Sequence, residues 1–318
     1  MKVPKVTVLM SVFNGIEYLE RAVESILNQS FRDFEFVIIN DGSTQPVIPV
    51  IERYSDARVV LINQENKGLT SSLNRGLSLA RGDYIARMDS DDISLPNRLE
   101  IQWAAMESDP SLDLVGSFYE VIDRSGKVCE VKTLIQDTAY RLWRLQFHNV
   151  YGHGTVMLRK TKVLTAGGYD EKLTFAQDYD LWSRLCVLDN TLIVPKVLYQ
   201  YRLVDQGTQS SVAHYYAQLA NAARTSDRNL KRCNPGLSWE DCEEVRAVFW
   251  KFQQSTMSER GLELLIPTFE GFLARFNVPR LQREQLAQKV LDDVIEEING
   301  DQSVSKANKE SLMVRFAE

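Results

Sequence analysis

Acidic side chains gather in one short stretch of the sequence, Arg87-Met88-Asp89-Ser90-Asp91-Asp92, directly after an apolar run. Three carboxylates within four residues repel one another when all are ionised, so they need a cation nearby or full exposure to water. Hard oxygen ligands of this kind suit Mg²⁺ or Mn²⁺, which share their coordination shell with phosphate oxygens. The cluster alone is equally consistent with a solvated loop before a helix that starts near Pro96.

Small and polar residues follow three other apolar runs, as Ser11-Val12-Phe13-Asn14-Gly15, Asn40-Asp41-Gly42-Ser43-Thr44 and Asn66-Lys67-Gly68-Leu69. Taken singly, each segment indicates a turn or a helix cap. An acid such as Asp41 at a strand end can also accept hydrogen bonds from a ribose or a base edge. Backbone N–H groups and the side chain of Lys67 can face a ligand. Because four successive strand ends carry such residues, we interpret them together as one ligand-binding edge.

A second acidic segment, Gln177-Asp178-Tyr179-Asp180-Leu181-Trp182, lies at the start of a predicted helix. Asp178 can act as a general base, or it can simply cap the helix while Asp180 interacts with the helix dipole. His153, in Gly152-His153-Gly154-Thr155, is predicted to be a hydrogen-bonded structural histidine and not a ligand.

The elements that must position these residues alternate between strand and helix over the first hundred residues. Short apolar runs predict strands, and apolar residues at helical spacing predict the helices between them. The predicted strands are 6–12, 34–39, 58–62 and 84–88, and the predicted helices are 18–27, 47–54 and 69–80, with a further helix near Pro96. Such alternation indicates an α/β fold with a mostly parallel sheet and helices on both faces. Ligands of such sheets bind beyond the carboxyl ends of the strands.

The pattern changes further along the chain. Residues 112–134 predict a hairpin around Arg124-Ser125-Gly126, followed by a helix at 137–147, a short strand at 155–158, a helix at 178–188 and an extended segment at 192–201. After about Ser211 only helices are predicted, for instance 240–254 and 280–298. We therefore expect a domain at 1–211 and a helical region at 212–318, which would contact an acceptor, a membrane surface or another subunit.

Two features of this helical region bear on membrane contact. Basic residues recur near helical spacing from Arg224 to Arg232, and the segment 261–276 is rich in leucine and phenylalanine. For each helix separately, a solvated face and a packed core are the favoured interpretations, whereas the two features together would suit a membrane surface.

Composition narrows the function classes. The 318 residues carry a net charge of −6, which gives the whole chain no electrostatic reason to bind nucleic acid. None of the four cysteines belongs to a Cys-x-x-Cys pair, so we expect no structural zinc site. Scattered thiols in a chain of this length are typical of reduced, cytosolic proteins, so we expect a cytosolic location. The cysteines are Cys129, Cys186, Cys233 and Cys242. The N-terminus lacks a secretory signal, and no apolar run approaches the about 20 residues of a membrane span.

With these motifs in view, the sequence resembles family 2 glycosyltransferases of the GT-A fold, especially the bacterial branch that builds O-antigen and other surface polysaccharides. The resemblance covers about residues 6–211. It depends on Asn74-Arg75-Gly76, the stretch 81–92, His153-Gly154-Thr155, Gly167-Gly168-Tyr169-Asp170 and the segment 177–182.

The resemblance implies a role for each candidate residue. Asp91 would hold Mn²⁺ or Mg²⁺, Asp89 would contact the ribose or support the metal, and Asp178 would be the catalytic base. The remaining residues would contact the donor nucleotide. Ser11 and Phe13 would lie at the base, and Asp41 at the base or the ribose. Arg202, which follows Tyr201, would contact the diphosphate, and the other contacts to the nucleotide would come from Asn66, Lys67, Gly68 and Ser90.

The resemblance also implies a reaction. An inverting, metal-dependent transferase would move a hexose from a nucleotide sugar, most commonly a UDP sugar, to a saccharide acceptor on a polyprenyl diphosphate at the inner face of the membrane. A nucleotidyltransferase is the alternative enzyme, but it would be expected to have a glycine-rich basic loop where Ser11–Gly15 stands. A non-catalytic nucleotide-sugar-binding protein is the other alternative. The sugar, the acceptor, the linkage and the oligomeric state stay open.

Overall fold

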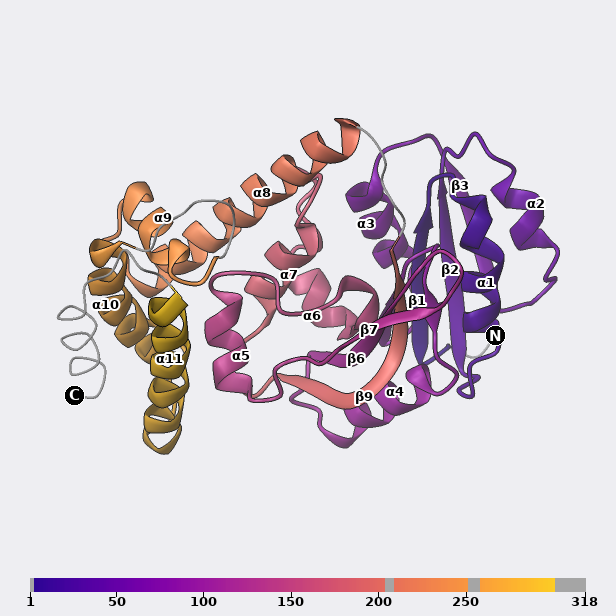
Figure 1. The fold of residues 1–318 in the computed structure, drawn as a ribbon. Coiled ribbons are helices and arrows are strands. Elements are labelled where there is room, and N and C mark those ends of the chain that lie inside the picture. The colour runs from indigo at the N-terminus through magenta and orange to yellow at the C-terminus, as the bar shows by residue number, and fades with distance from the viewer. Residues whose placement is uncertain (1–2, 204–208, 251–257, 301–318) are drawn as a thin grey trace. The chain divides into compact units, whose positions relative to one another are not determined.

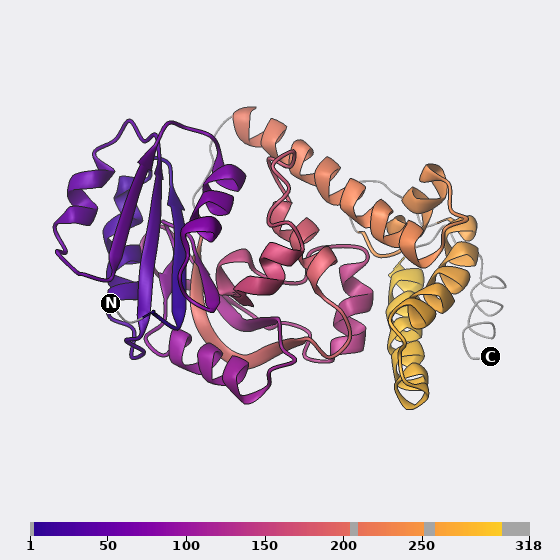
Figure 2. The ribbon, with the colours of Figure 1, turned by 180° about the vertical axis from the view of Figure 1, so that it is seen from behind.

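The computed structural model describes residues 3–203, 209–250 and 258–300 and divides the chain into two compact units (Figures 1 and 2). The first comprises Met1–Gln136 and Tyr151–Gln218, and the second comprises Asp137–Val150 and Leu219–Glu318. The division expected at residue 211 therefore falls inside the first unit. Segment 137–150, which we expected in the first domain, groups with the C-terminal helices instead.

A parallel sheet forms the first half of the first unit, as the alternation of strands and helices predicts. Its strands pair in the order β3-β2-β1-β4. The elements are β1 (Val6–Val12), α1 (Ile16–Leu27), β2 (Phe34–Asp41), α2 (Val47–Glu52), β3 (Val59–Gln64), α3 (Leu69–Leu79) and β4 (Tyr84–Met88). These four strands run parallel to one another, so their carboxyl ends meet at one edge of the sheet.

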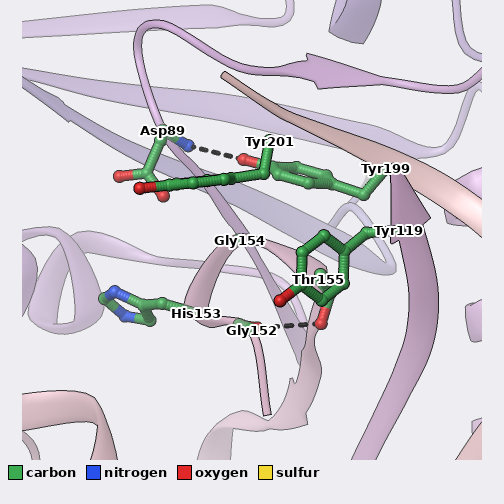
Figure 3. Close-up of a pocket in the computed structure, with 8 residues that line it drawn as sticks. All are labelled: Asp89, Tyr119, Gly152, His153, Gly154, Thr155, Tyr199 and Tyr201. Atoms are coloured by element: carbon green, nitrogen blue, oxygen red, sulfur yellow. Dashed lines mark hydrogen bonds between the residues drawn. The ribbon is translucent and has the colours of Figure 1, made fainter. Parts of the chain in front are cut away.

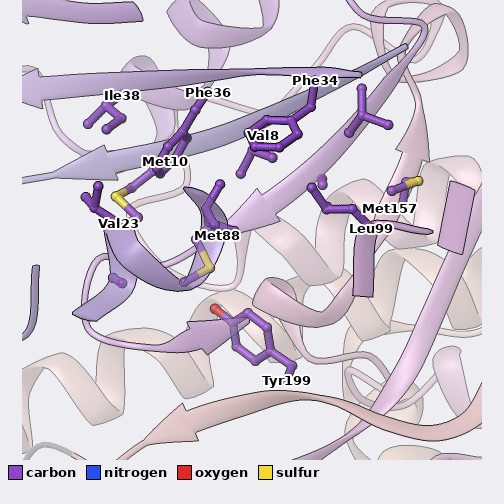
Figure 4. Packing of buried hydrophobic residues seen from close by; sticks show 14 of the residues in the cluster. Val8, Met10, Val23, Phe34, Phe36, Ile38, Met88, Leu99, Met157 and Tyr199 are labelled. Atoms are coloured by element: carbon purple, nitrogen blue, oxygen red, sulfur yellow. The ribbon is translucent and has the colours of Figure 1, made fainter. Parts of the chain in front are cut away.

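Helices cover both faces of this sheet because alternate strand side chains point to opposite sides. On one face, Val8 and Met10 of β1 pack against Val23 of α1 in the main apolar cluster (Figure 4). On the other face, α3 approaches Leu9 so closely that a Cβ on Gly76 would lie 2.1 Å from a Leu9 methyl carbon. Glycine at this position therefore permits the close contact between α3 and the sheet.

The rest of the sheet mixes directions and completes nine strands within the described residues. Strand β8 pairs antiparallel with β4 and with β6, while β9 runs parallel to β6. The predicted hairpin is present as β6 and β7, and the two-residue β5 pairs with β9. The further elements are β5 (Ile93–Ser94), α4 (Arg98–Ser108), β6 (Leu114–Ile122), β7 (Val128–Lys132), β8 (Met157–Arg159), α6 (Lys160–Thr165), α7 (Gln177–Leu185) and β9 (Thr191–Arg202).

Helices alone make up the described part of the second unit. They are α5 (Thr138–Leu145), the later part of α8 (Gln209–Cys233), α9 (Trp239–Ala247), α10 (Glu259–Arg275) and α11 (Arg280–Gly300). Helix α9 replaces the predicted helix 240–254, whose end lies outside the described residues. The Trp143 ring is the centre of this unit, with the rings of Phe147, Phe269 and Phe272 at 4.8, 5.1 and 5.3 Å.

Several apolar residues of the segment 261–276 contribute to this core. Leu262, Leu265, Phe269 and Phe272 are all buried, as the packed-core interpretation predicts for these four residues. In the basic stretch, Lys231 places its ammonium 4.1 Å from the ring of the exposed Trp239. Across the described residues, none of the helices is both long enough and apolar enough to span a bilayer.

Candidate active site

The acidic loop after β4 is built on a buried arginine. Arg87 is 1% exposed, and its Nη2 donates to Asp89 Oδ1 at 2.5 Å. Its Nε donates to His153 Nε2 at 3.3 Å. A guanidinium in the interior needs a counter-charge, and Asp89 supplies it. Sequence reasoning assigned no role to Arg87, although an arginine two residues before an acid at a strand end could have indicated this pair.

Both carboxylate oxygens of Asp92 form hydrogen bonds within the protein. Its two carboxylate oxygens accept from the Tyr199 hydroxyl at 2.8 Å and from the Arg202 backbone N–H at 2.7 Å. The Tyr199 hydroxyl in turn accepts from the Asp89 backbone N–H at 3.2 Å. Burial raises the pKa of Asp92 well above its usual range, and the neighbouring acids Asp89 and Asp91 raise it further. Asp92 therefore joins the acidic loop to the end of β9.

Asp91 is the carboxylate best suited to a divalent cation. Burial, followed by the charge of Asp89, raises the pKa of Asp91 to about 6, which a bound cation would reverse. Within the described chain no cationic side chain forms an ion pair with it, and nowhere do three or more potential ligands gather into a cage. Mg²⁺-type sites commonly use one or two carboxylates with substrate phosphates and water. Asp91, supported by Asp89, fits that pattern.

Asp178 lies at the start of α7, as the sequence predicts, but it does not cap the helix. The helix begins at Gln177, and the capping position is Ala176, held in the left-handed region at φ 56° without a side-chain cap. The half-buried Asp178 accepts from the Tyr179 backbone N–H at 2.8 Å. Asp180 differs, because it is buried and its carboxylate accepts two bonds, at 2.7 and 2.9 Å, from Arg184.

Tyr169 brings Asp178 and the acidic loop into one neighbourhood. The Tyr169 hydroxyl lies 2.9 Å from His153 Nε2, and because Arg87 donates to that same nitrogen, the tyrosine must donate as well. Burial raises the pKa of Tyr169, while the nearby charges of Asp178 and Asp89 raise it further. Burial also holds the pKa of His153 well below its usual range, so the expected structural histidine is confirmed.

Asn74 fixes the segment that carries Tyr169. Its amide donates to the Tyr169 carbonyl and accepts from the Tyr169 N–H, both at 2.9 Å. This contact joins α3 to the turn 167–170, which lies almost a hundred residues further along the chain.

On the nucleotide side, Asp41 organises the loop after β3. Its carboxylate accepts from the backbone N–H groups of Lys67 and Gly68 at 2.9 and 2.8 Å, and from Gln64 Nε2 at 2.7 Å. The sequence predicted that Asp41 and residues 66–68 serve one ligand, and the structure brings them together. Asn66, Lys67 and Gly68 are all exposed.

The loop after β1 meets the loop after β2 through Asn14. Its side-chain oxygen accepts from the backbone N–H groups of Thr44 and Gln45 at 2.9 and 3.1 Å. Phe13, beside it, is 53% exposed and has a ring face available for stacking. Ser11 and Ser90 are half-buried at the ends of β1 and β4.

Arg202 is buried beneath the acidic loop. Its Nε donates to the Asp91 carbonyl at 2.9 Å, and its Nη1 donates to the Asp123 carbonyl at 2.9 Å. Its guanidinium carbon lies 4.5 Å from the centre of the Tyr18 ring, and its Nη2 has no hydrogen-bond partner in the described structure. A diphosphate contact of Arg202 stays a prediction, because the guanidinium is buried in this structure.

A pocket of about 130 Å³ opens beside Asp89 (Figure 3). Tyr119 of β6 and Tyr201 of β9 line it together with residues 152–155. Burial, followed by the charges of the three loop acids, raises the pKa of Tyr201 to about 12, and burial also raises the pKa of Tyr119. Both phenols are therefore protonated at neutral pH. Nothing in the sequence of β6 indicated that Tyr119 belongs to a site.

Comparison with known proteins agrees with this arrangement. The model of the glycosyl transferase family 2 matches residues 7–164. The uncharacterized glycosyltransferase MJ1057 of Methanocaldococcus jannaschii is 36% identical over 282 residues, covering 85% of this chain and 92% of that protein. The O-antigen biosynthesis glycosyltransferase WbnJ of Escherichia coli is 33% identical over 218 residues, covering 66% of this chain and 84% of that protein.

Among solved structures, S. aureus TarS 1–349 in complex with UDP-GlcNAc is similar with a TM-score of 0.59. It is 16% identical to this chain, and the match covers 98% of this chain and 91% of that chain. At this identity the likeness shows the fold.

Proposed function

The chain belongs to glycosyl transferase family 2, with the GT-A fold predicted from its sequence, and on that premise we propose an inverting, metal-dependent hexosyltransferase. The donor is a nucleotide sugar, and the acceptor is a hydroxyl group of a saccharide. Asp178 is the catalytic base, and Asp91 with Asp89 holds the cation.

One observation carries this proposal. Helix α7, which carries Asp178, places its Trp182 ring 6.1 Å from the ring of His153. His153 in turn accepts from Arg87, the partner of Asp89, although the two acids are almost ninety residues apart. A base and a diphosphate-binding acid must share one site for a direct displacement, because the acceptor oxygen attacks as the diphosphate leaves. The chain through His153 and Arg87 gives that neighbourhood a fixed geometry.

The chain's own residues perform the steps of the reaction as follows. Asp178 accepts the proton of the acceptor hydroxyl as its oxygen attacks the anomeric carbon, a contribution of about 10²–10⁴-fold. The transition state resembles an oxocarbenium ion. A cation at Asp91 would neutralise charge on the departing diphosphate. No second carboxylate is needed to protonate the leaving group, which explains why Asp180 and Asp92 can be committed to structural contacts.

The loops after β1, β2 and β3 would hold the nucleoside. Phe13 offers a face for stacking on the base, and the loop at Lys67 and Gly68, fixed by Asp41, offers its exposed edge. We propose UDP as the nucleotide, which TarS binds as UDP-GlcNAc in a similar fold.

The acceptor is proposed to be a saccharide linked to a polyprenyl diphosphate in surface-polysaccharide synthesis, with the enzyme working at the inner face of the membrane. The name of WbnJ, which places that relative in O-antigen biosynthesis, supports the pathway class. The stacked pair of Lys231 and the exposed Trp239 is a surface feature that would suit an anionic lipid headgroup.

The test is a transfer assay with radiolabelled UDP-sugars and a saccharide acceptor pool, run on the wild type and on Asp178→Asn. Transfer that depends on Asp178 and releases UDP supports the proposal. Formation of a nucleotide sugar with release of pyrophosphate would identify a nucleotidyltransferase instead. Donor binding without turnover under every condition would identify a binding protein.

A further inference from the structure

The pocket beside Asp89 is too small for a nucleoside. At about 130 Å³ it lies well below the about 300–1,000 Å³ of pockets that bury drug-sized ligands. The aromatic rings of Tyr119, Tyr199 and Tyr201 line it, together with the Asp89 carboxylate (Figure 3). A single ring with both an apolar face and polar edges matches these walls.

Two glycines among the lining residues leave room for the side chains that shape this pocket. A Cβ on Gly154 would lie 2.2 Å from the Tyr199 hydroxyl oxygen, and a Cβ on Gly152 would lie 2.9 Å from a Thr155 methyl carbon and 3.4 Å from the Tyr119 ring. A side chain at either position would therefore displace residues that shape the pocket.

Two hydroxyl groups in the pocket wall lack a hydrogen-bond partner among the residues that the structure describes. Neither Tyr119 Oη nor Tyr201 Oη forms a hydrogen bond with any described residue, whereas Tyr199 Oη bonds to Asp92 and Asp89. Tyr201 is 46% exposed, and Figure 3 shows its hydroxyl directed toward the Asp89 carboxylate. The Tyr119 hydroxyl is directed toward residues 152 and 153. The pocket therefore offers two hydrogen-bond donors and an acidic acceptor around an aromatic surface.

The order of the strands places this pocket on the side of Asp89 that the nucleoside does not use. The candidate nucleotide residues follow β1, β2 and β3, whereas the pocket is lined from β6, β9 and the segment before β8. Since β4 stands between these groups of strands, a diphosphate at the end of β4 would have its nucleoside on one side and a sugar on the other.

We propose that this pocket binds one pyranose ring and that the hydroxyl groups of Tyr119 and Tyr201 determine which sugar it accepts. The inference rests on the glycosyltransferase function proposed above. The ring is either the sugar of the donor or the terminal sugar of the acceptor, and both present the same combination of C–H face and hydroxyl edge.

The first arm of the test measures donor binding. Isothermal titration with Mn²⁺ compares UDP, UDP-glucose and UDP-N-acetylglucosamine on the wild type, Tyr119→Phe, Tyr201→Phe and the control Tyr54→Phe. Tyr54 lies just after α2 and does not line the pocket, and its hydroxyl donates to the Glu20 carbonyl at 3.3 Å. If the donor sugar occupies the pocket, each pocket variant weakens a UDP-sugar by about two- to tenfold and leaves UDP and the melting temperature unchanged.

The second arm measures acceptor-type sugars. Saturation-transfer NMR with methyl β-D-glucopyranoside and methyl β-N-acetylglucosaminide, with and without UDP, reports a sugar bound outside the donor. If the acceptor ring occupies the pocket, the pocket variants lose this signal and bind every UDP-sugar as the wild type does.

Unchanged binding of all sugars in both pocket variants overturns the proposal. If the wild type binds neither UDP nor any UDP-sugar, the proposed function is refuted instead. The glycoside measurement distinguishes failure of the pocket proposal from failure of the proposed function, because it is also made without nucleotide.

Discussion

Replacing Asp91 by asparagine should stabilise the metal-free protein, although it should abolish cation-dependent donor binding. The pKa of Asp91 is raised from an ordinary 3.8 to about 6, mainly by burial and then by the charge of Asp89. A rise of about two units corresponds to about 3 kcal/mol of unfavourable free energy in the ionised folded state, at about 1.4 kcal/mol per unit. Asparagine keeps the shape of the side chain and removes this charge.

The stability gained by Asp91→Asn is expected to depend on pH. A carboxyl whose pKa is raised by folding costs no stability below its unfolded pKa, about 4. The cost grows as pH rises toward about 6 and is complete above that value. In EDTA, urea unfolding should therefore show a gain of up to about 3 kcal/mol for Asp91→Asn at about pH 8, and about half of that gain at about pH 5.

Asp89→Asn is the matched control, because it removes a charge from the same loop with the opposite consequence. Asp89 pairs at 2.5 Å with Arg87, which is 1% exposed. Removal of one partner of a buried ion pair costs about 3–5 kcal/mol, so this variant should lose stability. The reasoning is refuted if Asp91→Asn is less stable than the wild type at about pH 8 in EDTA, or if its gain is the same at both pH values.

The remaining predictions concern the reaction, the nucleotide loop and the second core. Asp178→Asn should slow transfer by about 10²–10⁴-fold without weakening UDP in a titration; an unchanged kcat removes Asp178 from the mechanism. EDTA should stop transfer, and Mn²⁺ or Mg²⁺ should restore it; full activity in EDTA contradicts a metal role. Asp41→Ala frees two backbone N–H groups of the loop after β3 and should weaken UDP by about tenfold or more, whereas equal affinity means that this loop does not meet the nucleotide. Trp143→Ala empties the centre of the helical unit and should cost about 3–5 kcal/mol in urea unfolding; a loss under about 1 kcal/mol would show that this ring is not central.

The sequence was informative where burial follows a simple period. Strands β1, β2 and β4 are buried on both faces, so they appear as apolar runs whose ends predict the acidic loop and the turns at Asn14 and Asp41. Strand β5 has two residues and β8 has three, so both are too short to show a period in the sequence. The pairing of β5 with β9, and of β8 with β4 and β6, depends on tertiary contacts that a local pattern does not reveal.

The separate roles of the three loop acids could not be predicted, because their partners are remote in the sequence. Asp92 bonds to Tyr199 and Arg202, more than a hundred residues away, whereas Asp89 pairs with Arg87, two residues away. The neighbourhood of Asp178 and the acidic loop likewise depends on Tyr169, which Asn74 holds in place. Such contacts are fixed by tertiary packing, so only the residue types and their place at strand ends were visible in advance.

The central claim is that one cation at Asp91 and the base Asp178 serve the same donor sugar. A crystal structure with UDP-glucose or UDP-N-acetylglucosamine and Mn²⁺, together with the anomalous signal of manganese, tests it most directly. The account predicts a manganese peak in direct contact with an Asp91 carboxylate oxygen and a diphosphate oxygen, with Asp178 facing the anomeric carbon. A manganese peak away from Asp91, or an Asp178 side chain turned away from the sugar, would contradict it.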